Sequence, residues 1–67
     1  MISARNQVPG KITAVKLGAV AAEVVISAAG VEIVAAITRA SAERMKLAAG
    51  DRVTAIIKAS DVMIAKD

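Results

Sequence analysis

Three short segments of this sequence combine hydroxyl groups with positive charge. Ser3–Gln7, Thr38–Ser41 and Lys58–Asp61 each contain at least one serine or threonine and one arginine or lysine. Hydroxyl and backbone N–H groups donate hydrogen bonds to the oxygens of a compact anion, and arginine or lysine offsets its charge. Such a set of groups is suited to binding a compact oxyanion.

Each segment also has a purely structural interpretation. Thr38 or Ser41 can cap the N-terminus of a helix, where free N–H groups and the helix dipole also favour an anion. Arg5 and Lys58 can be solvated surface charges. Asp61 is expected to be a turn residue, because its carboxylate would repel an anion. The residues alone leave both interpretations open.

The composition excludes several classes of catalytic and metal site. The 67 residues include no cysteine and no histidine, which rules out disulfides, zinc clusters and catalysis by thiolate or imidazole. The sequence contains no glycine-rich phosphate loop, and no two carboxylates have the spacing of an acid–base or metal pair. We therefore expect a protein that is not an enzyme, has no cofactor and has no metal-ion site.

Alternating apolar residues predict β-strands over most of the chain. Val20–Ala28, Val31–Thr38 and Arg52–Lys58 place apolar side chains at every second position, which is the period of a strand. An earlier strand covers the residues from Lys11 onward, after a turn or bulge at Pro9–Gly10. A last short strand is expected over Asp61–Ala65.

One segment interrupts these strands. Residues 39–48 contain no valine or isoleucine and favour a helix, which we expect Gly50 to end in the C′ position. Three strands, a helix and two strands are the element order of an all-β, five-stranded OB-type Greek-key barrel with one short helix between strands 3 and 4. Residues 1–67 are expected to form a single domain.

The chain is short and apolar enough to require partners. Hydrophobic residues make up 57% of it, and a core of about 70 residues without disulfides or metal is only marginally stable. Several outward positions of the predicted strands are also apolar: Val25, Val34, Ala36, Ile56 and Met63. We therefore expect an obligate oligomer in which the barrel wall is buried against neighbouring subunits.

The apolar stretch Leu17–Thr38 does not have the composition of a membrane span. Glu23 and Glu32 interrupt it, whereas a span needs about 20 consecutive apolar residues. The N-terminus lacks the apolar region of a signal peptide. A cytoplasmic protein with no membrane partner is therefore expected.

The quoted segments together resemble the molbindins, the small molybdenum-pterin-binding proteins whose unit is a TOBE-type OB domain. The resemblance rests on the Ser-Ala-Arg-Asn-Gln opening at Ser3–Gln7, on Gly10–Lys11, on Ala36–Thr38 and on the tail Ile57–Ile64. It implies a homohexamer, a trimer of dimers, that binds molybdate or tungstate between subunits and stores the ion without changing it. The metal would be bound only as its oxyanion.

The resemblance also implies which residues bind the anion. On the matching positions these are Ser3, Ala4, Arg5, Thr38, Ser41, Lys58 and Ser60. Ser3, the backbone N–H of Ala4 and Arg5 would donate from one subunit, with Lys58 adding a second positive charge. Thr38 and Ser41 would donate from a partner subunit.

A different class of function stays open beside this one. A non-catalytic OB interaction module could bind a protein partner or single-stranded nucleic acid. Nucleic acid is disfavoured, because such binding uses aromatic stacking platforms and the sequence has no aromatic residue. The residues alone also do not distinguish sulfate, phosphate, molybdate and tungstate, which are all tetrahedral.

Overall fold

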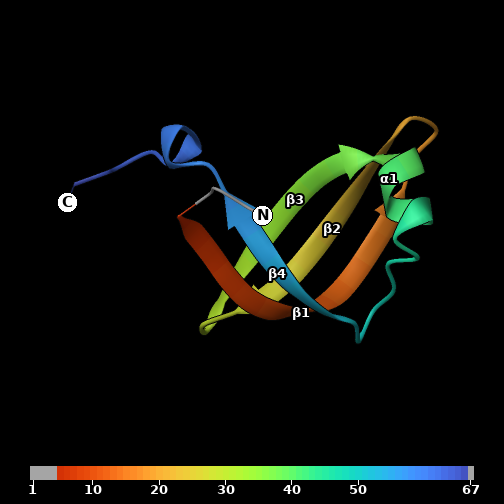
Figure 1. The fold of residues 1–67 in the computed structure, drawn as a ribbon, viewed down its shortest axis with the longest axis horizontal. Helices are drawn as coiled ribbons and strands as arrows, with labels where there is room; N and C mark the ends of the chain where they lie inside the picture. Colours follow the sequence, from red (N-terminus) through yellow and green to blue (C-terminus); the bar gives the residue numbers. More distant parts are fainter. Residues whose placement is uncertain (1–4, 67) are drawn as a thin grey trace.

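The structure is a computed structural model that describes residues 5–66, and these form a curved sheet with a short helix at one end (Figure 1). In chain order the elements are β1 (Asn6–Leu17), β2 (Ala21–Ala28), β3 (Val31–Thr38), α1 (Arg39–Arg44), β4 (Arg52–Ile57) and the 3-10 turn η1 (Ala59–Asp61).

The four strands form one antiparallel sheet with the order β3-β2-β1-β4. Three consecutive strands are joined by tight connections, and the fourth returns to lie beside the first, which is the Greek-key arrangement. The helix lies between β3 and β4 in the chain. The predicted all-β class, the Greek-key connection and the position of the helix between the third and fourth strands are therefore confirmed.

Strand β1 bends so that it can pair with two different neighbours. Its first half pairs with β4 and its second half with β2, and Lys11 has a partner in both. A Cβ on Gly10 would lie 2.6 Å from the carbonyl oxygen of Ser27, so only glycine permits this approach. The expected turn or bulge at Pro9–Gly10 is wrong: both residues lie within β1, and the register shifts between Ile12 and Ala14.

The core lies on the concave face of the sheet. It consists of the buried side chains of Ile12, Val24, Ile26, Ala28 and Ala55. In β2 the burial alternates from residue to residue, as the apolar pattern predicts. Val20, expected to share this face, precedes β2 and is 78% exposed, because the chain there still forms the loop after β1.

The helix is shorter than predicted and ends at another residue. It covers Arg39–Arg44, not residues 39–48, and Lys46 has the left-handed backbone (φ 53°) that we expected of Gly50. The N–H of Lys46 donates to Glu43 O at 3.0 Å, and that of Leu47 donates to Ala42 O at 3.1 Å. This is the Schellman motif. It turns Leu47 toward the core cluster, which ends the helix.

The predicted fifth strand is absent from the described residues. Ala59–Asp61 form η1, and residues 62–66 belong to no helix or strand. Figure 1 shows this tail leading away from the sheet. A strand needs a partner edge, and after the turn at η1 the tail does not pair with the free edge of β3 or of β4. The four described strands therefore form an open sheet in place of the predicted closed five-stranded barrel.

Among residues 5–66, no helix is long and apolar enough to cross a membrane.

Candidate functional site

The first group of predicted site residues lies where β1 begins and β4 ends. Asn6 pairs with Ile57, so Arg5 and Lys58 are the next residues on the two antiparallel strands. Both residues are exposed, and within the described residues neither cation has a carboxylate partner. The register therefore brings these two positive charges to one edge of the sheet. Ser3 and Ala4, predicted to donate beside Arg5, lie outside the described residues.

Ser60 lies close to this edge because η1 turns the chain immediately after β4. The N–H of Asp61 donates to the carbonyl oxygen of Lys58 at 2.9 Å, which closes the turn around Ser60. Ser60 is exposed, and its hydroxyl lies two residues from Lys58 in the chain. Asp61 is a turn residue, as predicted. We refer to Arg5, Lys58 and Ser60 as the β1–β4 cluster.

Thr38 and Ser41 form a second cluster where β3 joins α1. Thr38 is the N-cap of the helix, and its Oγ1 accepts from the N–H of Ser41 at 3.1 Å. The same Oγ1 donates to Ser41 Oγ at 2.8 Å. The proton of the Thr38 hydroxyl is therefore used, whereas the proton of the Ser41 hydroxyl has no acceptor in these contacts. Ser41 is the group of the pair that is ready to donate to an anion.

Arg44, which is not among the site residues predicted from the sequence, joins this second cluster. Its Nη2 donates to Ser41 Oγ at 3.3 Å, and no carboxylate in the described residues pairs with it. The sequence could have indicated this contact, because Ser41 and Arg44 are three residues apart and residues with this spacing lie on one face of a helix. We refer to Thr38, Ser41 and Arg44 as the helix cluster.

Arg39 lies between Thr38 and Ser41 in the chain but has other partners. Its Nε donates to Glu43 Oε1 at 2.8 Å, and its Nη1 donates to the carbonyl oxygen of Gly18 at 3.3 Å. The ion pair offsets the charge of the guanidinium, and the second contact ties the helix to the loop after β1. Arg39 is therefore a structural residue, and we leave it out of the candidate site.

The two clusters lie far apart in one chain. The β1–β4 cluster lies beside the start of β1, whereas Thr38 pairs with Ala21, next to the end of β1. In Figure 1 η1 and α1 lie at opposite ends of the longest axis of the molecule, which extends 36 Å. A single chain therefore does not bring the two clusters to one ligand.

Within the part of the chain that the structure describes, no three carboxylates gather where they could hold a metal ion. The chemistry of the site therefore depends on hydroxyl, amide, guanidinium and ammonium groups, which all donate hydrogen bonds to an anion.

Comparisons with known proteins match this arrangement to one family. The TOBE domain matches residues 2–64. Molybdenum-pterin-binding protein 3 of Clostridium pasteurianum is 48% identical over 64 residues, which are 94% of each chain.

Two solved structures have the same fold. MopII from Clostridium pasteurianum in an apo form superimposes with a TM-score of 0.93 at 43% identity, covering 98% of this chain and 100% of MopII. ModG, described as a cytoplasmic molybdate-binding protein and solved with molybdate bound, gives a TM-score of 0.83 at 47% identity. That match covers 87% of this chain and 42% of ModG. The chain belongs to the TOBE-domain family and, within it, to the molybdenum-pterin-binding proteins, the molbindins.

Proposed function

We propose that this protein binds molybdate and tungstate as intact oxyanions and buffers their concentration in the cytoplasm, without any enzymatic step. The anion sites lie between subunits of a homohexamer. One subunit supplies the β1–β4 cluster to each site, together with Ser3 and the N–H of Ala4. A second subunit supplies the helix cluster.

The separation of the two clusters is the observation that carries this proposal. Each cluster supplies hydroxyl and cationic donors, but one chain holds them at opposite ends of its long axis. If the start of β1 in one chain lies beside α1 in a second chain, both clusters can contact the same anion. Neighbouring subunits of a symmetric oligomer can have this arrangement.

The exposed apolar residues support the oligomer. Val34 on β3 is 57% exposed and Ile56 on β4 is 46% exposed, on strand faces that point away from the core. Both were predicted to face neighbouring subunits. Large apolar side chains exposed on the outward faces of these strands would be buried against neighbouring subunits in such an oligomer.

The charges of the clusters support a divalent anion. Arg5 and Lys58 lie in the β1–β4 cluster and Arg44 lies in the helix cluster, and none of the three has a carboxylate partner in residues 5–66. Charge-assisted hydrogen bonds from these cations would therefore offset the charge of a dianion held between two chains. Molybdate and tungstate carry the same charge and shape. The relatives point to molybdenum: one is named a molybdenum-pterin-binding protein and another holds molybdate.

Native mass spectrometry tests the ligand and the assembly together. The purified protein is measured alone, with molybdate, with tungstate and with a large excess of sulfate, and is quantified by peptide-bond absorbance because it has no aromatic residue. We expect a hexamer that gains whole numbers of molybdate or tungstate masses and keeps them in sulfate. A hexamer whose added mass is displaced by sulfate would contradict the proposed ligand, and a monomer would contradict the interfacial site.

A further inference from the structure

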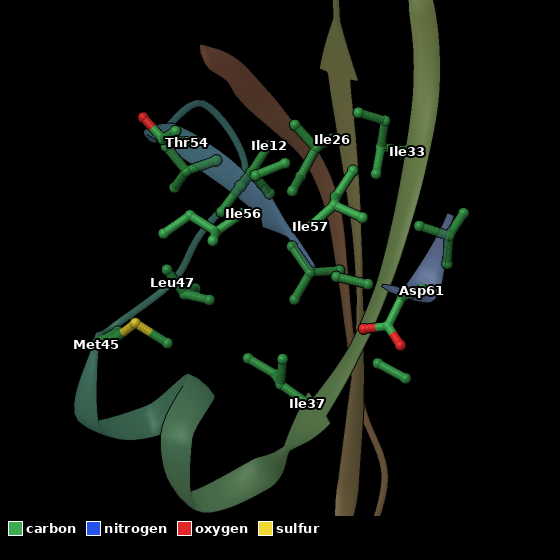
Figure 2. Close-up of a pocket in the computed structure, with 16 residues that line it drawn as sticks. Ile12, Ile26, Ile33, Ile37, Met45, Leu47, Thr54, Ile56, Ile57 and Asp61 are labelled. Atoms are coloured by element: carbon green, nitrogen blue, oxygen red, sulfur yellow. The ribbon is translucent and has the colours of Figure 1, made fainter. Parts of the chain in front are cut away.

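The concave face of the sheet opens into an apolar groove between β3 and β4 (Figure 2). Its volume is about 410 Å³, and among the described residues that line it only Thr54 and Asp61 are polar. Apolar side chains give an anion no hydrogen bonds, and the carboxylate of Asp61 repels it. Discrimination between anions therefore depends on the β1–β4 cluster and the helix cluster.

The hydroxyl oxygen of Ser41, in the helix cluster, has both of its acceptor positions occupied. Thr38 Oγ1 donates to Ser41 Oγ at 2.8 Å, and Arg44 Nη2 donates to it at 3.3 Å. A serine hydroxyl has two lone pairs that accept and one proton that it can donate. With both lone pairs in use, Ser41 can offer a ligand only its proton.

The chemistry of the two neighbours fixes the direction of these hydrogen bonds. The guanidinium of Arg44 has no acceptor atom, so it can only donate. Only one proton can lie between Thr38 Oγ1 and Ser41 Oγ, so when Ser41 gives its own proton to a ligand, that proton comes from Thr38. Thr38 Oγ1 also accepts from the backbone N–H of Ser41 at 3.1 Å, which holds the two side chains together. Both neighbours therefore hold Ser41 as a donor.

The cationic groups of the proposed site also lack acceptors. Guanidinium and ammonium groups, which Arg5, Arg44 and Lys58 supply, donate hydrogen bonds and accept none. An anion that carries a proton needs an acceptor for its O–H group, and an O–H group that meets only donors loses a hydrogen bond. A serine with a free lone pair would supply that acceptor, and the contacts from Thr38 and Arg44 remove this possibility at Ser41.

We propose that Arg44 is a positioning residue that, together with Thr38, holds Ser41 as a pure donor and so favours oxyanions that carry no proton. Molybdate, tungstate and selenate carry no proton at neutral pH, whereas phosphate and arsenate carry at least one. This selection by protonation is separate from selection by size, because two anions of equal size can differ in their protons. It deepens the proposed function and rests on it, since Ser41 contacts an anion only in the site between subunits.

Competition between selenate and arsenate tests the inference. The two anions are tetrahedral and nearly equal in size, and in mildly alkaline solution both are dianions and only arsenate carries a proton. Each is titrated against the molybdate-loaded protein at constant ionic strength, and the molybdate retained is measured. We expect wild type to bind selenate about tenfold more tightly than arsenate, a factor limited by the Ser60 hydroxyl, which can still accept. Equal displacement by the two anions would overturn the inference.

Arg44→Met frees one lone pair of Ser41 and keeps a side chain of similar length. We expect it to lower the preference for selenate over arsenate at least about threefold, because Ser41 can then accept from the arsenate O–H. Arg39→Met is the matched control: it removes a guanidinium from the same helix, but one that contacts Glu43 and the carbonyl oxygen of Gly18. Its preference should equal that of wild type. An unchanged preference in Arg44→Met, or an equal fall in both variants, would overturn the inference.

Thr38→Val makes the same change at Ser41 without altering any charge. It removes the other hydrogen bond to Ser41 Oγ and keeps the shape of the side chain, so a lower preference for selenate in this variant cannot be an effect of charge. The variant also loses the N-cap, and circular dichroism checks that it is folded. A folded Thr38→Val protein with the wild-type preference would overturn the inference. If it does not fold, the comparison of Arg44→Met with Arg39→Met decides.

The inference and the proposed function fail on different results. A protein that retains no molybdate at all contradicts the proposed function. A protein that retains molybdate but releases it equally to selenate and arsenate contradicts only the role of Arg44 and Thr38. If neither anion displaces molybdate, size alone selects the ligand, and the inference is likewise overturned.

Discussion

Thr38 and Ser41 are joined by two hydrogen bonds that have different functions. The N–H of Ser41 donates to Thr38 Oγ1 at 3.1 Å, and Thr38 Oγ1 donates to Ser41 Oγ at 2.8 Å. The first bond caps the helix and needs only the Thr38 side chain. The second orders the Ser41 hydroxyl and leaves its proton free. Stability and anion binding can therefore be separated by substituting one residue of the pair at a time.

Thr38→Ala is expected to lower the free energy of unfolding by about 1 kcal/mol, the usual cost of a lost N-cap. Ser41→Ala keeps the cap, because its backbone N–H is retained, so its stability should stay within about 0.5 kcal/mol of wild type. Both should bind molybdate more weakly. Urea unfolding followed by far-ultraviolet circular dichroism, with calorimetric titration of molybdate, measures the two effects. Equal loss of stability in both variants would contradict this division.

Arg5→Gln and Lys58→Gln are each expected to raise the Kd for molybdate about 10-fold to 100-fold. The physical reason is that a hydrogen bond to a charged group contributes about 1.5–3 kcal/mol, and 1.4 kcal/mol is a factor of ten. Calorimetric titration at constant ionic strength measures the change.

Lys11→Gln is the control for that pair. Lys11 is exposed in the middle of β1, opposite Ser27 and Arg52 and six residues from Arg5, and the substitution removes the same charge. Its Kd should remain within about twofold of wild type, since remote exposed charges are screened by salt. If all three variants weaken binding equally, the effect is one of net charge and the assigned cluster is incorrect.

Much of the fold can be predicted because β2 and β4 follow a strict two-residue pattern. Ala22, Val24, Ile26 and Ala28 are all buried, and they alternate with positions that include the polar residues Glu23 and Ser27. Turn residues are also visible: Ala29 and Gly30, with φ of 52° and 78°, form the two-residue hairpin between β2 and β3. Such local signals fix strands and turns without knowledge of the partner elements.

The parts that could not be predicted depend on contacts distant in sequence. Residues 45–48 have good helix propensity, yet Leu47 leaves the helix because it packs against the core cluster. The pattern over Asp61–Ala65 is that of a strand, but a strand forms only where an unpaired edge is available. The separation of Arg5 from Thr38 is likewise set by the length and curvature of β1, which no short motif encodes.

Arg44→Gln is expected to weaken molybdate binding about two- to fivefold, whereas Arg39→Gln should leave the Kd unchanged. Arg44 contacts Ser41 Oγ and has no carboxylate partner in the described residues, so its charge is available to an anion. The charge of Arg39 is offset by Glu43, 2.8 Å away. The estimate for Arg44 corresponds to about 0.5–1 kcal/mol, typical of an exposed charge interaction. Titration of both variants measures it, and equal effects would contradict the distinction between the two arginines.

Lys46→Gly is expected to stabilise the protein by about 0.5–1 kcal/mol. Lys46 has φ of 53° at the C′ position of α1, a left-handed conformation that glycine adopts without the clash of a Cβ. The gain is reduced by the greater freedom of glycine in the unfolded chain. Lys46→Ala is the control, because alanine has the same Cβ, so its unfolding free energy should match wild type within about 0.5 kcal/mol. Urea unfolding measures the free energy of unfolding of the wild type and both variants. If Lys46→Ala is stabilised as much as Lys46→Gly, the cause is the lost charge and not the backbone conformation.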